Sequence, residues 1–186
     1  MTSTSNPQPP RKLDALAALL SFLVPGMGQI YQGRVGKGIL FLLSLYTLFF
    51  YGMWMGQWSN VYLPDSSVAN NYVFRFKPLG DVENRVQFAG QFWIGIAAWP
   101  AVIQYAASDP NQPNKELPIL KSYQKAPSET RLNELQRNGD KRWDLGWVYT
   151  VIAGVLNILV IYDALAGPVH RDVPGKSDEK KEAVAS

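Results

Sequence analysis

The sequence predicts an all-α membrane protein, a small bundle of about four hydrophobic helices with a short amphipathic surface helix. Two observations support this fold class. Apolar residues make up 47% of the 186 residues, yet the mean hydropathy is close to neutral, because long apolar blocks alternate with polar stretches. Three of the blocks contain about 20 residues each and almost no charge, which is the length of helix that crosses the hydrocarbon core of a bilayer.

The first block, residues 13–31, is interrupted by Pro25 and Gly26, which remove a backbone donor and loosen a helix. The part before the interruption would rise only about 18 Å as a helix. The block therefore either continues and spans the bilayer, or is re-entrant and turns back at the Pro-Gly pair. Asp14 near its start suits a helix N-terminus, where the helix dipole favours negative charge.

The other three blocks are each long enough for one crossing. Residues 36–56 would reach about 31 Å as a helix, and Trp54 near the far end is typical of the aromatic belt at a membrane interface. Residues 87–107 contain Pro100, at which we expect a kink that neighbouring helices tolerate. Residues 145–165 form the last block.

Two polar loops separate these blocks. Residues 57–86 contain an alternating run at 72–77 that predicts a short strand outside the bilayer. Residues 108–144 predict a short helix that could lie on the membrane surface. Its expected features are Ser128 as the N-cap, Leu132 and Leu135 as a narrow apolar edge, and Gly139 as the stop.

Both ends of the chain are too polar to bury apolar surface. Residues 1–12 and the charged residues 168–186 are predicted to be disordered tails, which leaves residues 13–167 as the membrane domain. Under four full crossings, Lys and Arg divide equally between the two sides of the membrane. A re-entrant first block puts more of them on the side of the 108–144 loop, which would then be cytoplasmic.

The composition argues against several functional classes. The chain has no Cys and a single histidine, His170, so disulfides, thiol nucleophiles, a His-based triad and a multi-His metal cluster are excluded within one chain. No Lys lies deep in a block where it could activate Ser21 or Ser44 for hydrolysis. The net charge of +3 arises from Lys and Arg that flank apolar blocks, which disfavours nucleic-acid binding. We therefore expect no catalytic residues, no cofactor and no metal.

Two glycine patterns imitate nucleotide-binding motifs. The run that starts at Gly26 begins like a dinucleotide fingerprint, but Tyr31 replaces the third glycine and an apolar helix precedes it. Gly28 and Gly33 have the spacing of a phosphate-binding loop, but an Arg-Val pair follows instead of Lys and Ser or Thr. We expect no nucleotide to bind.

The most distinctive string is VPGMGQIYQGR, from Val24 to Arg34, followed by Gly-Lys-Gly at the start of the second block. Glycines permit positive φ or close backbone approach, so the string predicts a tight helical hairpin with its aromatic residue at the interface. Arg34 and Lys37 are expected to stay among the lipid headgroups. The expected structural residues of this turn are Pro25, Gly26, Gly28, Tyr31 and Gly33.

This string resembles the Pro-Gly-x-Gly-Gln-x-Tyr-x-Gly turn of the two-helix TM-two domain and of related bacterial membrane proteins, and the match covers residues 15–56. A second stretch, from Asp144 to Ala164, contributes to a resemblance to an uncharacterised bacterial membrane-protein family, a domain of unknown function. Met27-Gly28-Gln29 lacks the charged triplet of the eukaryotic branch. The resemblance implies an architecture and a multi-pass location in the bacterial cytoplasmic membrane, with no reaction attached.

Helical periodicity assigns faces to the last two blocks. Small and polar residues gather within about 60° on the fourth block and within about 100° on the third. Lipid offers their polar side chains no partners, so the two stripes are predicted to face protein and each other. The fourth-block stripe is Gly146, Thr150, Ala153, Asn157 and Ala164, and the third-block stripe is Gln87, Gly90, Gln91, Ala98 and Ala101.

Three functional hypotheses remain open. The first is a noncatalytic scaffold or interaction module in the lipid bilayer that assembles with itself or with other membrane proteins. The second is a small channel or transporter component that uses Asn157 and the candidate functional carboxylate Asp163, although the position of Asp163 near the end of its block favours an interfacial or capping role. The third is a lipid-binding protein that uses Arg34 and Lys37.

Overall fold

A computed structural model describes residues 13–63, 86–107, 117–137 and 141–167. Within these residues the chain is mostly helical, with seven α-helices and no β-strand, so the predicted helical class is confirmed. Three expectations fall outside the described residues: the strand at 72–77, the two disordered tails and the stop at Gly139.

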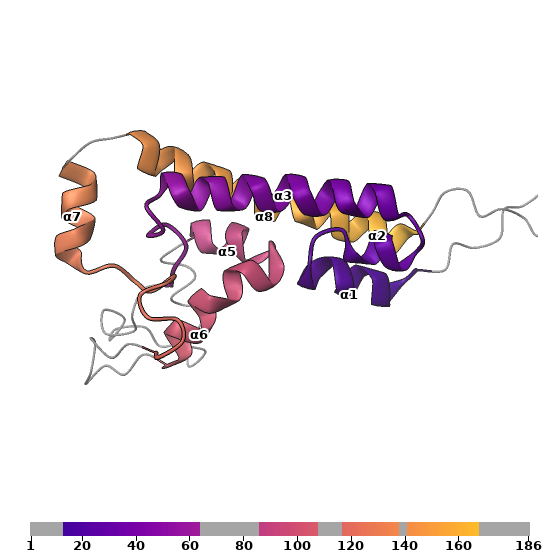
Figure 1. Cartoon of the computed structure of the whole chain (residues 1–186), viewed down its shortest axis with the longest axis horizontal. Coiled ribbons are helices and arrows are strands. Elements are labelled where there is room, and N and C mark those ends of the chain that lie inside the picture. Colours follow the sequence, from indigo (N-terminus) through magenta and orange to yellow (C-terminus); the bar gives the residue numbers. More distant parts are fainter. Residues whose placement is uncertain (1–12, 64–85, 108–116, 138–140, 168–186) are drawn as a thin grey trace, which may run out of the picture.

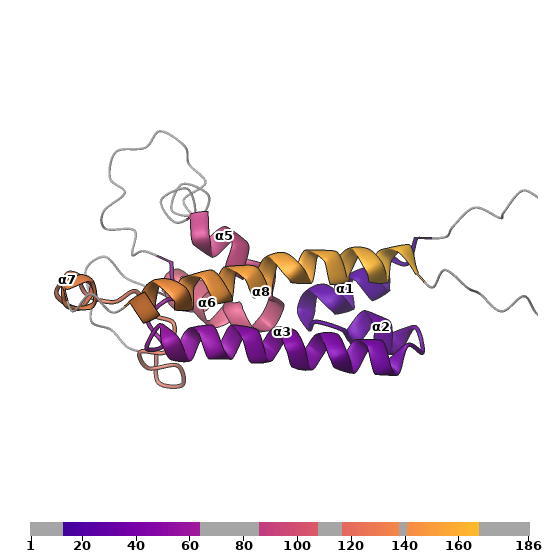
Figure 2. The same cartoon turned by 90° about the horizontal axis from the view of Figure 1, so that it is seen from above.

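Two long helices, α3 (Val35–Met55) and α8 (Lys141–Ala166), lie side by side over most of their length (Figures 1 and 2). They are antiparallel, because Lys37 at the start of α3 pairs with Asp163 near the end of α8. Glycines bring the backbones together at the opposite end, where a Cβ added to Gly52 would lie 2.8 Å from the carbonyl oxygen of Gly146. Both helices are long and apolar enough to cross a membrane.

The first block forms a hairpin, which we call the first hairpin, from α1 (Ala15–Leu23) and α2 (Met27–Tyr31). The reversal takes place around Gly26, whose φ is +85°. Both ends of this hairpin lie at the C-terminal end of α8 (Figure 1): the amide of Asp14 donates to the carbonyl of Leu165 at 3.0 Å, and the side chain of Gln32 donates to the carbonyl of Ala164 at 2.7 Å. The chain thus enters and leaves at one end, as in the re-entrant interpretation.

The third block forms a second hairpin, from α5 (Val86–Phe92), the 3₁₀-helix η2 (Gly95–Ala98) and α6 (Trp99–Ala107). The expected kink at Pro100 is wrong, because the chain turns instead at Gly95, where φ is +83°. Pro100 lies in the first turn of α6, where a missing backbone N–H costs no helical hydrogen bond.

This second hairpin enters from the opposite end of the long pair. Near the end of α6, Gln104 donates to the carbonyl of Tyr123 at 3.2 Å, and the ring of Tyr123 packs against Trp58, just beyond the C-terminus of α3. In Figures 1 and 2, α5 and α6 accordingly lie toward the end where α3 stops and α8 begins, away from α1 and α2.

The tips of the two hairpins meet beside the middle of α8. The ring of Phe22 lies 5.7 Å from that of Phe92 and 5.9 Å from that of Trp93, measured between centroids. Gly95 fits directly against the carbonyl oxygens of Phe22 and Leu23. The structure therefore contains two long helices and two opposed hairpins rather than four helices of similar length. The helices before each turn have only nine and seven residues, too few to continue across a bilayer.

The short helix expected in the second polar loop is present as α7 (Glu129–Arg137), beyond the end of the long pair in Figure 1. Ser128 caps it, since its Oγ accepts a hydrogen bond from the amide of Arg131 at 3.3 Å, and this prediction is confirmed. Leu135 is buried. The hydrophobic core lies between α3, α8 and the second hairpin, and includes Phe49, Met53, Ile94, Ala98 and Ala153.

Candidate functional site

The candidate site is the side of α8 that faces both hairpins and α3. The expected fourth-block stripe lies on this side, and all five of its residues are buried. In the third block, Gly90 is half-buried and Gln91, Ala98 and Ala101 are buried, but Gln87 is exposed. The polar side chains here form three groups along α8, one at each end and one in the middle.

The first group is an ion cluster at the C-terminal end of α8. Asp163 Oδ2 lies 2.9 Å from a guanidinium nitrogen of Arg34, and its Oδ1 lies 2.7 Å from Lys37 Nζ. Arg34 also donates to the side chain of Gln32 and to the backbone carbonyl of Asp163. From the sequence, both cations are expected among the lipid headgroups, and their pairing with Asp163 is not predicted. In the sequence, only the opposite charges at the ends of two blocks indicate this pairing.

Gln29 of the VPGMGQIYQGR string links the first hairpin to α8. Its side chain is fully buried and donates to the carbonyl of Val160 at 2.9 Å and to Asp163 at 3.2 Å. Its oxygen accepts a hydrogen bond from Ser21 Oγ at 3.0 Å, and Ser21 Oγ in turn accepts one from the amide of Gly28 at 3.1 Å. One amide side chain thus joins α1, α2 and α8, which explains a Gln at this point of the turn.

The other turn residues have different roles. Pro25 is buried, and Gly26 packs on the backbone of Gly38. Tyr31 is 58% exposed at the end of α2. Of the two reasons for a glycine in this string, close backbone approach does not apply at Gly33, because a Cβ added there would meet nothing within 4 Å. A φ of +81° is the feature that favours glycine at this position.

Asn157 joins the tips of the two hairpins in the middle of α8. It is fully buried, and its Nδ2 donates to the carbonyl of Ser21 at 3.1 Å and to the carbonyl of Trp93 at 2.7 Å. Both carbonyls belong to segments that stop or turn here, so their oxygens are not all used within helices. Asn157 therefore supplies donors to two chain reversals at once.

The third group lies toward the N-terminal end of α8. Gln91 of α5 donates to Thr150 Oγ1 at 2.7 Å and to the carbonyl of Asn60 at 3.1 Å. Asn60 in turn donates to the carbonyl of Gly52 at 3.1 Å. The second hairpin is thus held to both long helices by neutral amides. The sequence placed Gln91 and Thr150 on matching stripes, but nothing in the pattern indicated Asn60.

These groups are suited to holding backbone segments together. Their side chains are mostly neutral amides and hydroxyls, and the carboxylate of Asp163 is paired with two cations. In the described part of the chain, no group of three or more His, Cys, Asp or Glu residues could hold a metal ion. Neither Asn157 nor Asp163 lines any of three surface pockets that lie among the described residues.

Comparison with known proteins places the chain in a group without an assigned activity. It is 53% identical over 38 residues to an uncharacterized protein of the archaeon Methanocaldococcus jannaschii. This match covers 20% of the present chain and 38% of the relative, so the chain spans well under half of that protein's length. No solved structure matches the chain. Residues 16–177, which include both hairpins and both long helices, match a single family, and the chain therefore belongs to the family of unknown function DUF6677.

Proposed function

We propose that this protein is a noncatalytic integral membrane module, in which two spanning helices and two opposed re-entrant hairpins form a scaffold for interactions within the bilayer. The observation that supports it best is the exposure of the two long helices. Only 28% of the most apolar stretch of α3 and 33% of that of α8 is buried inside the protein. The central helix of a soluble protein would be covered on most sides.

The exposed side chains are large and apolar. Leu40 and Leu43 of α3 are 64% and 59% exposed, and Leu159 of α8 is 63% exposed. Water makes such a surface costly, at roughly 25 cal/mol for each Å² of apolar area, whereas lipid does not. Tyr51, Trp54 and Leu145 continue the exposed apolar surface toward the other end of the pair.

The polar interior agrees with this proposal. Backbone groups at a chain reversal need partners when no water reaches them, and non-helical backbone at membrane depth is tolerated only where protein covers it. Asn157 provides such a partner for the carbonyl of Ser21 near the tip of the first hairpin, and Ser21 Oγ provides one for the amide of Gly28 at the start of α2. These hydrogen bonds support a structural role for Asn157, and for Gln29, which accepts the hydrogen bond of Ser21.

Interaction with another protein, or with a second copy, would use the outer faces of α3 and α8. The small residues that could admit a neighbouring helix, such as Gly52, Gly146 and Gly154, already pack inside the chain. The proposed location is the cytoplasmic membrane, of a bacterium by the resemblance of the turn or of an archaeon by the relative described above.

Two measurements test this proposal. Washing membranes with alkaline carbonate should leave the full-length protein in the pellet, and its release into the supernatant would contradict membrane insertion. Light scattering of protein purified in mild detergent should give a protein mass above the 20.8 kDa of one chain, or mass spectrometry should identify a second membrane protein in fixed ratio. A monomer without a partner would contradict the scaffold role.

One observation favours a second candidate, a small channel or transporter component. Discontinuous helices that meet near the midplane of the bilayer are common at transporter substrate sites, and here two hairpin tips meet at Asn157. Liposomes containing the protein would then pass ions or protons faster than empty liposomes, and Asn157→Leu would change that rate. Equal leak rates for protein-containing and empty liposomes would exclude this candidate.

A further inference from the structure

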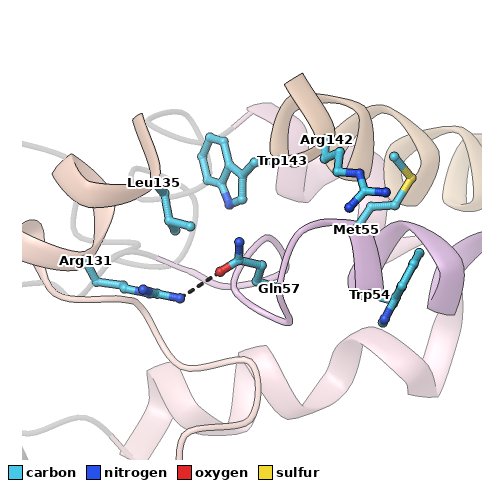
Figure 3. A pocket seen from close by; sticks show the side chains of 7 residues that line it. All are labelled: Trp54, Met55, Gln57, Arg131, Leu135, Arg142 and Trp143. Carbon is cyan, nitrogen blue, oxygen red and sulfur yellow. Dashed lines mark hydrogen bonds between the residues drawn. The ribbon is translucent and has the colours of Figure 1, made fainter. Parts of the chain in front are cut away.

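A pocket of about 260 Å³ lies between the end of α3, the start of α8 and α7. Figure 3 shows Arg131 reaching in from α7 on one side and Arg142 from the first turn of α8 on the other, with Trp143 between them. The lining consists of Trp54 and Met55 from α3, Gln57 after it, Arg131 and Leu135 from α7, and Arg142 and Trp143 from α8.

The charges around this pocket favour an anion. Two of its seven lining residues are arginines, and none is acidic. The nearest acidic partner is Glu134, whose carboxylate lies 3.4 Å from Arg131 Nη1 in a pair that is about half exposed, so the guanidinium keeps donors for a second anion. Arg131 is held in place by Gln57, whose Oε1 accepts its hydrogen bond at 2.8 Å (Figure 3). The N-terminal end of α8, a helix of 26 residues, adds the positive end of its dipole at Arg142 and Trp143. Guanidinium groups match the geometry of phosphate oxygens and bind them in pairs.

The remaining lining is apolar and aromatic. Leu135 is buried, and Trp54 is 56% exposed on the last turn of α3. Indole rings are typical of the headgroup level of a membrane, because one edge is polar and the body is apolar. A ligand in this pocket would therefore meet cations at one end and an apolar surface that leads along α3 at the other.

We propose that this pocket binds the phosphate of an anionic phospholipid, with the acyl chains running along the exposed surface of α3. The inference rests on the proposed function, because it requires a bilayer at this level of α3 and α8. The pocket lies at the other end of the molecule from Arg34 and Lys37, which share the carboxylate of Asp163 at 2.9 and 2.7 Å. The pocket is slightly smaller than those that enclose a drug-sized molecule, which suits a headgroup.

Thermal unfolding of the full-length protein in mild detergent tests this inference. Phosphatidylglycerol should raise the melting temperature at lower concentrations than phosphatidylcholine, and glycerol 3-phosphate should have little effect. Arg131→Gln with Arg142→Gln should weaken the apparent affinity for phosphatidylglycerol by about tenfold or more, because hydrogen bonds to charged groups are the stronger ones. The matched control, Lys121→Gln with Lys125→Gln, removes the same charge at the same end and should keep the wild-type affinity.

Three results would overturn the inference. The lysine control could lose as much affinity for phosphatidylglycerol as the arginine variant, or the arginine variant could keep the wild-type affinity. Glycerol 3-phosphate could raise the melting temperature as much as phosphatidylglycerol does, which would identify a soluble ligand. If the double arginine variant does not fold, Arg142→Gln alone repeats the test with the Arg131–Gln57 hydrogen bond intact, and a smaller loss is expected. Carbonate washing distinguishes a failure of the pocket inference from a failure of the proposed function. A wild-type protein that stays in membranes but shows no lipid preference contradicts the pocket only, whereas its release contradicts the proposed function.

Discussion

Replacing Gly28 by alanine tests how tightly the first hairpin is closed. A Cβ at this position would overlap the carbonyl oxygen of Ala17 and would lie 2.5 Å from Ser21 Oγ. The Ala17 atom belongs to the backbone of α1, so relief requires α1 and α2 to move apart. Such movement would also break the 3.1 Å hydrogen bond from the Gly28 amide to Ser21 and disturb the one between Ser21 and Gln29.

The expected loss follows from these contacts. Overpacking costs about 1–3 kcal/mol and each lost hydrogen bond about 0.5–1.5 kcal/mol, partly offset by the better helix propensity of alanine, so Gly28→Ala should lose about 2–5 kcal/mol. Gly33→Ala has no clash but keeps a positive φ, and should lose only about 1–2 kcal/mol. Gly36→Ala, in the first turn of α3 with open space around it, should be neutral or gain up to about 1 kcal/mol.

The assay is reversible unfolding of the detergent-solubilised protein by sodium dodecyl sulfate, followed by circular dichroism. All three variants add the same methyl group to a glycine of the same hairpin region, so differences among them report local packing and backbone conformation. Equal stabilities for Gly28→Ala and Gly36→Ala would refute the close approach of α1 and α2.

Two further predictions use the same assay. Asn157→Leu should lose only about 1 kcal/mol, because it removes two intramembrane hydrogen bonds that average about 0.6 kcal/mol each. Ala153→Leu should lose about 1–3 kcal/mol or more by adding bulk at a fully buried position, and the reverse order would show that packing is loose there. In the ion cluster, Arg34→Gln should destabilise more than Lys37→Gln, because the Arg34 side chain is 20% exposed and that of Lys37 is 42% exposed. Equal losses for the two variants would contradict a larger contribution from the less exposed Arg34 pair.

The sequence predicts the helical class and the composition of the buried face of α8, because both follow from periodicity within one segment. Gly146, Thr150, Ala153 and Asn157 fall on one side of any regular helix, so their common burial needs no knowledge of the partner. The Ser128 cap is predictable for the same reason, because its hydrogen bond goes to an amide only three residues further along the chain. The partners themselves are not local, which is why the two carbonyls that Asn157 contacts could not be named in advance.

The second hairpin shows where the sequence misleads. Residues 87–107 have the length and composition of a spanning helix, and Pro100 is the residue expected to bend it. Gly95 turns the chain instead, because a positive φ lets its backbone lie against the carbonyls of Phe22 and Leu23. That contact comes from a segment far away in the sequence, so hydropathy alone cannot distinguish a crossing from a hairpin here.

In the proposed membrane architecture, both hairpins return to the side of the membrane from which they enter. Because the chain contains no cysteine, single substitutions can be labelled one at a time with a membrane-impermeant maleimide on sealed vesicles of known orientation. Leu13→Cys and Gly36→Cys flank the first hairpin, and Ser59→Cys and Ser122→Cys lie on either side of the second. We predict that positions 13 and 36 react from one side of the membrane, and positions 59 and 122 from the other. Labelling of 13 and 36 from opposite sides, or of 59 and 122 from opposite sides, would contradict it.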